Sequence, residues 1–146
     1  MKGDPLPAGD HAARHCRQND LHYNGKIPDG ILECALVPDE DGLSVTWLEF
    51  FAGSDRKANM VGVRSAITAV LTPKPSNRLA VLNVGKIEQA GKAHSAGGLQ
   101  VIEDPYTDPP PGNPAHALVK EPATLADKTL REAIAATVQP GDIELY

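Results

Sequence analysis

The chain lacks the apolar segments that would place it in a membrane or send it through one. No run approaches the ~20 consecutive apolar residues of a membrane-spanning helix. The opening MKGDPLPAGD has no apolar stretch after its single lysine, as a secretory signal would. We therefore expect a cytoplasmic protein that does not associate with membranes.

Cysteine is also scarce, with two residues in the whole chain. Cys16 and Cys34 do not form a Cys-x-x-Cys pattern, and in a reducing compartment we expect them to remain free thiols. A chain of 146 residues can bury a core without disulfides. We predict a single globular domain spanning residues 1–146, with an irregular, Pro- and Gly-containing segment at residues 1–10.

Positive charge is neither abundant nor concentrated. The formal net charge is -5, and lysine and arginine are scattered along the chain, so the basic stripe typical of non-specific nucleic-acid binding is missing. A site for one unpaired base would need only a few basic side chains. A nucleic-acid partner is nevertheless not favoured.

The familiar nucleotide and hydrolase motifs are absent as well. Residues 84–86 (VGK) follow an apolar run as a phosphate loop would, but neither Gly-x-x-x-x-Gly-Lys-Ser/Thr nor Gly-x-Gly-x-x-Gly occurs. Gly-x-Ser-x-Gly and His-Glu-x-x-His are missing too. Enzymes with large cofactors and standard hydrolases are therefore not expected, and the sequence identifies no cofactor or metal.

What is present is a mixture of helix and strand patterns. One amphipathic helix is predicted from a cap at Ser54 to about Leu71, and another from a cap at Thr124 to about Val138. Apolar or alternating runs predict strands at 31–37, 43–51, 79–84, 99–102, 116–119 and 143–146. The sequence thus indicates an α+β fold with a small mixed or antiparallel sheet, two amphipathic helices and long Pro/Gly-rich loops.

The connections between these elements are predicted from their turn-forming residues. Residues 38–42 should join the first two strands as an antiparallel hairpin. Residues 11–17 read as one or two helical turns, residues 21–30 as a loop, and the Gly-rich stretch between 84 and 99 as a mobile connection. Four prolines between 109 and 114 exclude a helix or central strand there, leaving an ordered crossing or a disordered tip.

The first side chains that could bind a metal or act in catalysis lie in the predicted helical turns at residues 11–17. His11 and His15 would share a helix face with Cys16 beside them, an incomplete metal site, because zinc needs three or four ligands, or simply a solvated polar turn. Arg14 and Arg17 flank Cys16, which is either an activated thiol or a small buried one.

Two further features come from the predicted strands. Glu33 and Glu49 would share a hairpin face with Trp47, either as a two-carboxylate site or as ordinary solvent-facing acids. His116 follows a rigid segment at 113–115 and opens an apolar strand. It could act as a general acid or base, or serve as a structural histidine.

Four patterns together resemble a family of small bacterial proteins. They are His11-x-x-Arg14-x-Cys16, residues 43–49 (LSVTWLE), residues 79–85 (LAVLNVG) and Asn113-Pro114-x-His116. The similarity would span most of the chain. Family members carry Tyr at the position of His15 and Asn at that of Thr46, and the first difference argues against a His11/His15 metal pair. The resemblance implies a set of positions and no particular reaction.

We expect five candidate catalytic residues to converge in one site: His11, Arg14, Cys16, Glu49 and His116. In an enzyme, a hydrolase or transferase, His11 or His116 would move protons, Arg14 would hold an anionic substrate, and Glu49 would orient a base. The slightly favoured alternative is an accessory or binding protein of a multi-protein system, whose partner is another protein. Exposure separates the two, since a catalytic set lines an accessible pocket and a structural network is buried and paired.

Overall fold

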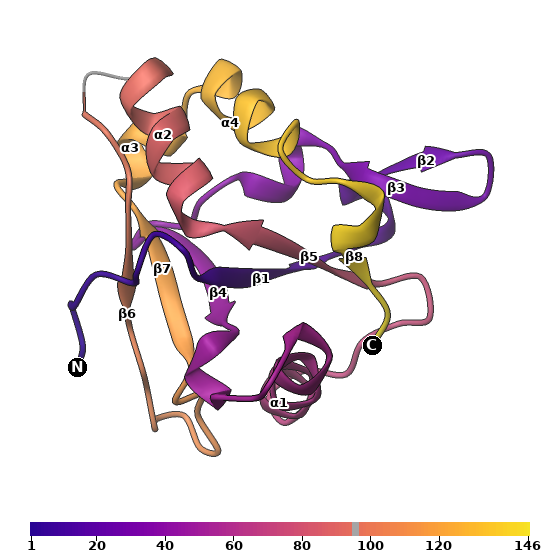
Figure 1. Cartoon of the computed structure of the whole chain (residues 1–146), viewed down its shortest axis with the longest axis vertical. Helices are drawn as coiled ribbons and strands as arrows, with labels where there is room; N and C mark the ends of the chain where they lie inside the picture. Colours follow the sequence, from indigo (N-terminus) through magenta and orange to yellow (C-terminus); the bar gives the residue numbers. More distant parts are fainter. Residues whose placement is uncertain (95–96) are drawn as a thin grey trace.

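The structure, a computed structural model, describes residues 1–94 and 97–146 and has an α+β fold, as predicted (Figure 1). Within these residues, an antiparallel six-stranded sheet has the strand order β6-β7-β4-β1-β5-β8. Its strands are β1 (His11–Cys16), β4 (Leu43–Trp47), β5 (Arg78–Asn83), β6 (Gln100–Glu103), β7 (His116–Lys120) and β8 (Ile143–Glu144). A separate two-stranded sheet consists of β2 (Leu21–Asn24) and β3 (Ile27–Ile31).

The helices cover the two faces of the large sheet unequally. They are α1 (Arg56–Thr68), α2 (Val84–His94), α3 (Pro122–Leu125) and α4 (Lys128–Ala135). Helices α2 and α4 lie together on one side, and α1 lies alone on the other (Figure 1). The chain thus forms a layer of helices, a sheet, and a partial second layer.

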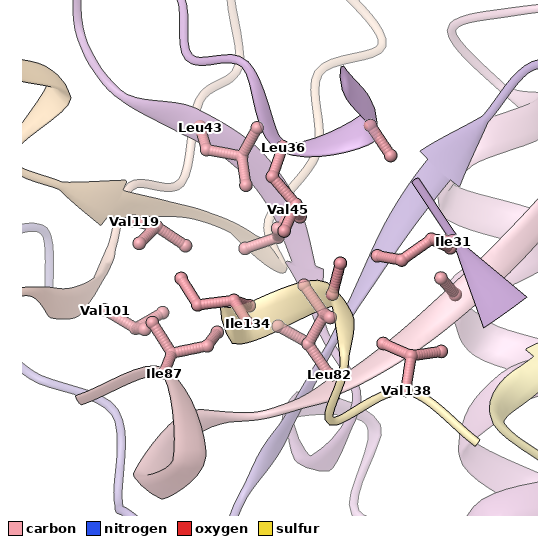
Figure 2. Close-up of a cluster of buried hydrophobic side chains, with 14 of the residues drawn as sticks. Ile31, Leu36, Leu43, Val45, Leu82, Ile87, Val101, Val119, Ile134 and Val138 are labelled. Atoms are coloured by element: carbon pink, nitrogen blue, oxygen red, sulfur yellow. The ribbon is translucent and has the colours of Figure 1, made fainter. Parts of the chain in front are cut away.

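The larger core lies between the sheet and the helices α2 and α4 (Figure 2). Leu82 of β5, Val119 of β7 and Ile134 of α4 are each at most 2% exposed. Burying one such side chain contributes about 1.5–3 kcal/mol. This face of the sheet is therefore devoted to packing.

The smaller core lies on the opposite face, under α1. Met60 and Val63 of α1 are fully buried against Ala13 of β1 and Val81 of β5. Because successive side chains of a strand point to opposite faces, the same face of β4 carries Ser44 and Thr46. Polar side chains therefore occupy the part of this face beside α1.

Helix α1 confirms the amphipathic helix predicted here, with a cap one residue later than Ser54. The carboxylate of Asp55 accepts a hydrogen bond from the backbone N–H of Ala58 at 2.8 Å. The last predicted helix is divided, because Asp127 caps α4 separately by accepting from the N–H of Thr129 at 2.9 Å. Each aspartate satisfies a backbone donor that a helix start leaves without an intrahelical partner.

The prediction of helical turns at residues 11–17 is wrong. Residues 11–16 form β1, which lies inside the sheet between β4 and β5. Ala12 and Cys16 face the larger core, and Ala13 faces the smaller one. A strand buried on both faces shows no alternation of apolar and polar residues, so its sequence resembles a short helix.

The predicted hairpin between residues 31–37 and 43–51 is also wrong. Residues 33–36 form a 3-10 helix, and β4 pairs with β1 and β7 instead. The turn itself exists, since Asp39 and Gly42 exchange backbone hydrogen bonds of 3.0 and 3.2 Å. Local sequence identified the turn and β4, but strand pairing depends on residues far away in the chain.

Two segments expected to be irregular are regular. Residues 21–31, predicted mostly as a loop, form the β2–β3 hairpin around Gly25, whose φ of 64° is suited to glycine. Helix α2 occupies most of the connection predicted to be mobile, while residues 95–96 of that connection lie outside the described residues.

The remaining strand predictions agree with the structure. Strands β5, β6 and β7 fall where apolar runs were found, and β8 pairs along β5. The Pro-rich segment is an ordered loop, because Asn113 donates its backbone N–H to the carbonyl of Tyr106 at 2.9 Å. That loop borders the candidate site.

Candidate functional site

A cleft of about 440 Å³ opens on the α1 side of the sheet. Ser44 and Thr46 of β4 and His116 of β7 line it, together with Tyr106 from the Pro-rich loop. Apolar side chains complete the wall, namely Ile67 in the last turn of α1 and Val70 and Leu71 just after the helix. The cleft therefore combines polar groups of the sheet with an apolar surface.

The register of β4 and β7 brings Ser44 and His116 together. Thr46 lies directly opposite His116, and Ser44 lies opposite Leu118. Diagonal neighbours on one face of an antiparallel pair are within reach of long or aromatic side chains. The Nε2 atom of His116 lies 3.2 Å from the Oγ of Ser44.

The other ring nitrogen of His116 faces Asp104, in the segment between β6 and β7. Its Nδ1 lies 2.9 Å from the backbone carbonyl oxygen of Asp104 and 3.1 Å from the carboxylate Oδ2. Both partners are acceptors, so in neutral His116 the proton belongs on Nδ1 and Nε2 accepts the hydrogen bond from Ser44. The three side chains form a Ser–His–Asp arrangement in which the carboxylate orients the imidazole.

The environment of His116 limits its movement while leaving it accessible. Its side chain is 15% exposed. The ring of Tyr106 meets the imidazole edge to face, with centroids 5.3 Å apart. An aromatic contact of this geometry holds the ring in one orientation.

Arg14 lies beside the same cleft and holds backbone groups. Its Nε donates to the carbonyl of Ala35 at 2.9 Å, and its Nη1 donates to the carbonyl of Ser44 at 3.0 Å. Burial lowers the pKa of the Arg14 guanidinium, although an arginine remains charged in proteins. Arg14 therefore fixes the strand that carries Ser44, and two of its donors are directed at carbonyls and not at a ligand.

Asn113 ties the Pro-rich loop to the sheet. It is 3% exposed, and its Nδ2 donates to the hydroxyl of Thr46 at 3.2 Å. Its Oδ1 accepts from the backbone N–H of Ala115 at 2.9 Å. The loop that carries Asp104 and Tyr106 is thus attached to the strand that carries Ser44.

His11 and Glu49 form a separate pair. Glu49 accepts from the backbone N–H of His11 at 2.7 Å and lies 3.0 Å from its Nδ1. His11 lines a cavity of about 100 Å³ that includes none of the residues lining the main cleft. Arg14 and His116 both line the main cleft without a contact between them, and His11 pairs with Glu49 elsewhere, so the expected convergence of these four residues does not occur.

The two cysteines occupy contrasting positions. Cys16 has no exposed surface, and burial raises the pKa of its thiol to about 12. Because the thiolate is the nucleophile, such a thiol is unreactive at neutral pH. Cys34 is exposed and lies outside the cleft.

His15 lies on the cleft side of β1 and contacts the hydroxyl of Tyr146 through Nδ1. Four residues along a strand separate it from His11 by about 13 Å, so the two cannot form the metal pair that a helix would have allowed. Within residues 1–94 and 97–146, no group of three or more His, Cys, Asp or Glu side chains is placed to hold a metal ion.

The two-carboxylate hypothesis fails with the predicted hairpin. Glu33 pairs with the guanidinium of Arg131 on α4 at 2.8 Å, whereas Glu49 contacts His11. Sequence reasoning also missed Ser44 and Asp104 as site residues. No motif marks them. The one available signal was their position in the sequence, since Ser44 precedes Trp47 in the same predicted strand and Asp104 directly precedes the Pro-rich loop.

Comparison with known proteins adds no family or fold relative. No family model, no curated protein and no solved structure matches this chain. No helix of the described residues has the length and apolar character needed to cross a membrane. The geometry of the cleft is therefore the basis for assigning a function to the protein.

Proposed function

We propose that the protein is a small serine-dependent hydrolase that cleaves carboxylic esters in the cleft between β4, β7 and α1. Ser44 is the nucleophile, His116 the general base and acid, and Asp104 the group that orients His116. The observation that supports this most directly is the pair of contacts on His116, 3.2 Å to the Ser44 hydroxyl and 3.1 Å to the Asp104 carboxylate.

The proposed reaction has two steps, acylation of Ser44 and hydrolysis of the acyl-serine. His116 Nε2 takes the proton of the Ser44 hydroxyl as Oγ bonds to the ester carbonyl carbon, and it then returns that proton to the departing alkoxide. An acyl-serine remains. Water gives a proton to His116 and attacks the acyl group, and the proton passes back to Ser44 Oγ as the acid leaves.

Two features of the site favour this chemistry. The guanidinium of Arg14 donates to the backbone carbonyl of Ser44, which fixes the strand segment that presents the Ser44 hydroxyl to His116. The apolar end of α1 offers a surface for the acyl chain. The nucleophile is thus held in a fixed strand, and the apolar surface lines the same cleft as Ser44.

The experiment is covalent labelling of the purified protein with a fluorophosphonate, followed by peptide mapping. We expect one adduct, on Ser44. Ser44→Ala should remove it, while Ser65→Ala, which changes an exposed serine on α1, should leave it unchanged. Hydrolysis of p-nitrophenyl butyrate should fall by about 10²–10⁴ in Ser44→Ala and His116→Gln, the range contributed by proton transfer to a nucleophile.

Asp104→Asn provides a finer test. The backbone carbonyl of Asp104 still accepts from His116 Nδ1, so the imidazole keeps its tautomer and loses only the nearby negative charge. We expect a smaller loss than for His116→Gln. An unlabelled Ser44, with Ser44→Ala as active as the wild type, would show that Ser44 is not the nucleophile.

The second candidate is an accessory or binding protein in which the same network holds loops in place and the partner is another protein. It is favoured by one observation: within the described residues, every buried side-chain nitrogen and oxygen has a hydrogen-bond partner. A network of this kind is what a structural role requires. Under this alternative Ser44→Ala retains partner binding and no fluorophosphonate adduct forms.

A further inference from the structure

The main cleft continues into a second cavity of about 350 Å³. His15 and Arg17 line both. The rest of its lining includes one more cation, Lys74, and the polar residues Gln18, Asn19 and Ser76. A ligand held near Ser44 could therefore extend past His15 into this space.

The second cavity is positively charged. Arg17 and Lys74 line it, and no aspartate or glutamate does. Arg17 is in an ion pair with Asp20, whose Oδ2 lies 3.9 Å from the Nε, but this is beyond hydrogen-bond distance, so the guanidinium keeps its donors. Among the described residues Lys74 has no ion-pair partner. Both cations can therefore bind an external anion.

Two ordered turns present the two cations to the cavity. In the first, Asp20 accepts from the backbone N–H of Arg17 at 2.8 Å. In the second, Asn77 is 6% exposed, and its Oδ1 accepts from the backbone N–H of Lys74 at 2.8 Å. The backbone positions of both residues are therefore set before a ligand arrives, which reduces the entropy lost on binding.

We infer that this second cavity binds a phosphate group, so that the substrate of the proposed hydrolase is a small ester that also carries a phosphate. The inference rests on the proposed function for the ester and on Arg17 and Lys74 for the phosphate. Two charged donors from separate turns suit an anion with several acceptor oxygens. Arg14, the residue expected from the sequence to hold an anion, is directed at backbone carbonyls instead.

Binding of inorganic phosphate to the whole protein tests the subsite without any reaction. We expect saturable shifts of the backbone amide signals of Gln18, Asn19 and Ser76 in ¹H–¹⁵N NMR spectra. Lys74→Ala and Arg17→Ala should each weaken phosphate binding about tenfold, as the loss of one charge-assisted hydrogen bond predicts. Lys92→Ala, on the exposed side of α2, is the matched control and should bind as the wild type does.

Four comparisons decide the outcome. Equal phosphate affinity in Lys74→Ala, Arg17→Ala and Lys92→Ala overturns the subsite, as does an equal response to chloride, which marks a general salt effect. Stronger binding of acetate or sulfate than of phosphate overturns the choice of anion. Ser44→Ala should keep full phosphate affinity, so failure of fluorophosphonate labelling with intact phosphate binding would refute the hydrolase and leave the subsite standing.

Discussion

Replacing Asn113 with alanine should destabilise the protein by an amount that its contacts define. The side chain is 3% exposed and makes two hydrogen bonds, to the Thr46 hydroxyl at 3.2 Å and from the N–H of Ala115 at 2.9 Å. The first, between neutral groups, contributes about 1 kcal/mol. Losing the second leaves the N–H of Ala115, a residue only 1% exposed, without that partner, at a cost of about 1–3 kcal/mol. Together we expect a loss of about 2–4 kcal/mol.

Urea unfolding followed by tryptophan fluorescence measures this loss. Trp47 is the only tryptophan and is partly buried in the sheet, so its emission should report global unfolding. The same loss should lower the melting temperature by about 6–12 °C, at about 3 °C per kcal/mol for a chain of this size.

A double-mutant cycle isolates the contact between the loop and the strand. Thr46→Val keeps the shape of the side chain and removes the hydroxyl that Asn113 reaches. Combined with Asn113→Ala, it should cost about 1 kcal/mol less than the sum of the two single changes, because both remove the same bond. A destabilisation below 0.5 kcal/mol for Asn113→Ala, or strict additivity in the cycle, would refute this account of how the loop is attached.

Three further predictions concern other parts of the molecule. Ellman's reagent should modify only Cys34 in the native protein and Cys16 only after unfolding, so two rapidly reacting thiols would contradict the buried position of Cys16. Burial lowers the pKa of His15 from its usual value of about 6.5, so protonation favours the unfolded chain. The free energy of unfolding, measured in urea at several pH values, should therefore keep the contribution of neutral His15 above pH 6.5 and decline below that pH. The decline should be less steep in His15→Gln. Gly62→Ala should destabilise by about 1–3 kcal/mol in urea unfolding despite the helix preference of alanine, because the added Cβ would lie 2.4 Å from ring carbons of Phe51; a stabilised variant would show that the ring moves freely.

Elements with a strong local pattern could be predicted from the sequence. Met60, Val63 and Ile67 recur at helical spacing, and all three face the smaller core. Residues 79–82 form a continuous apolar run, and β5 is indeed buried on both faces. These patterns are informative because burial of one helix face or of a whole strand determines several neighbouring residues at once.

The first strand and the hairpin show where local reasoning failed. In β1, Ala12 and Ala13 are both fully buried, on opposite faces. The six residues of this strand therefore show no alternation of apolar and polar side chains that would have identified it as a strand. Val37 and Leu43 are separated by a recognisable turn, yet β4 pairs with β1 and β7. A turn determines the direction of the chain, whereas pairing is decided by which surfaces bury the most apolar area.

Only part of the candidate site could be predicted from the sequence. His116 was identified from its rigid approach and its position at the start of a strand, and Arg14 from its neighbours. Their common cleft depends on the register of three strands. Ser44 has no distinguishing motif, and its role in the proposal comes entirely from the diagonal contact with His116.

The α+β class, the amphipathic helix α1 and several strand positions follow from local sequence, because capping, turn chemistry and hydrophobic spacing act over a few neighbouring residues. The pairing of the strands and the contacts between polar groups depend on the folded chain as a whole. The contact between Ser44 and His116 joins residues 72 positions apart, and a contact over that distance is made by the packing of the whole sheet and leaves no local pattern.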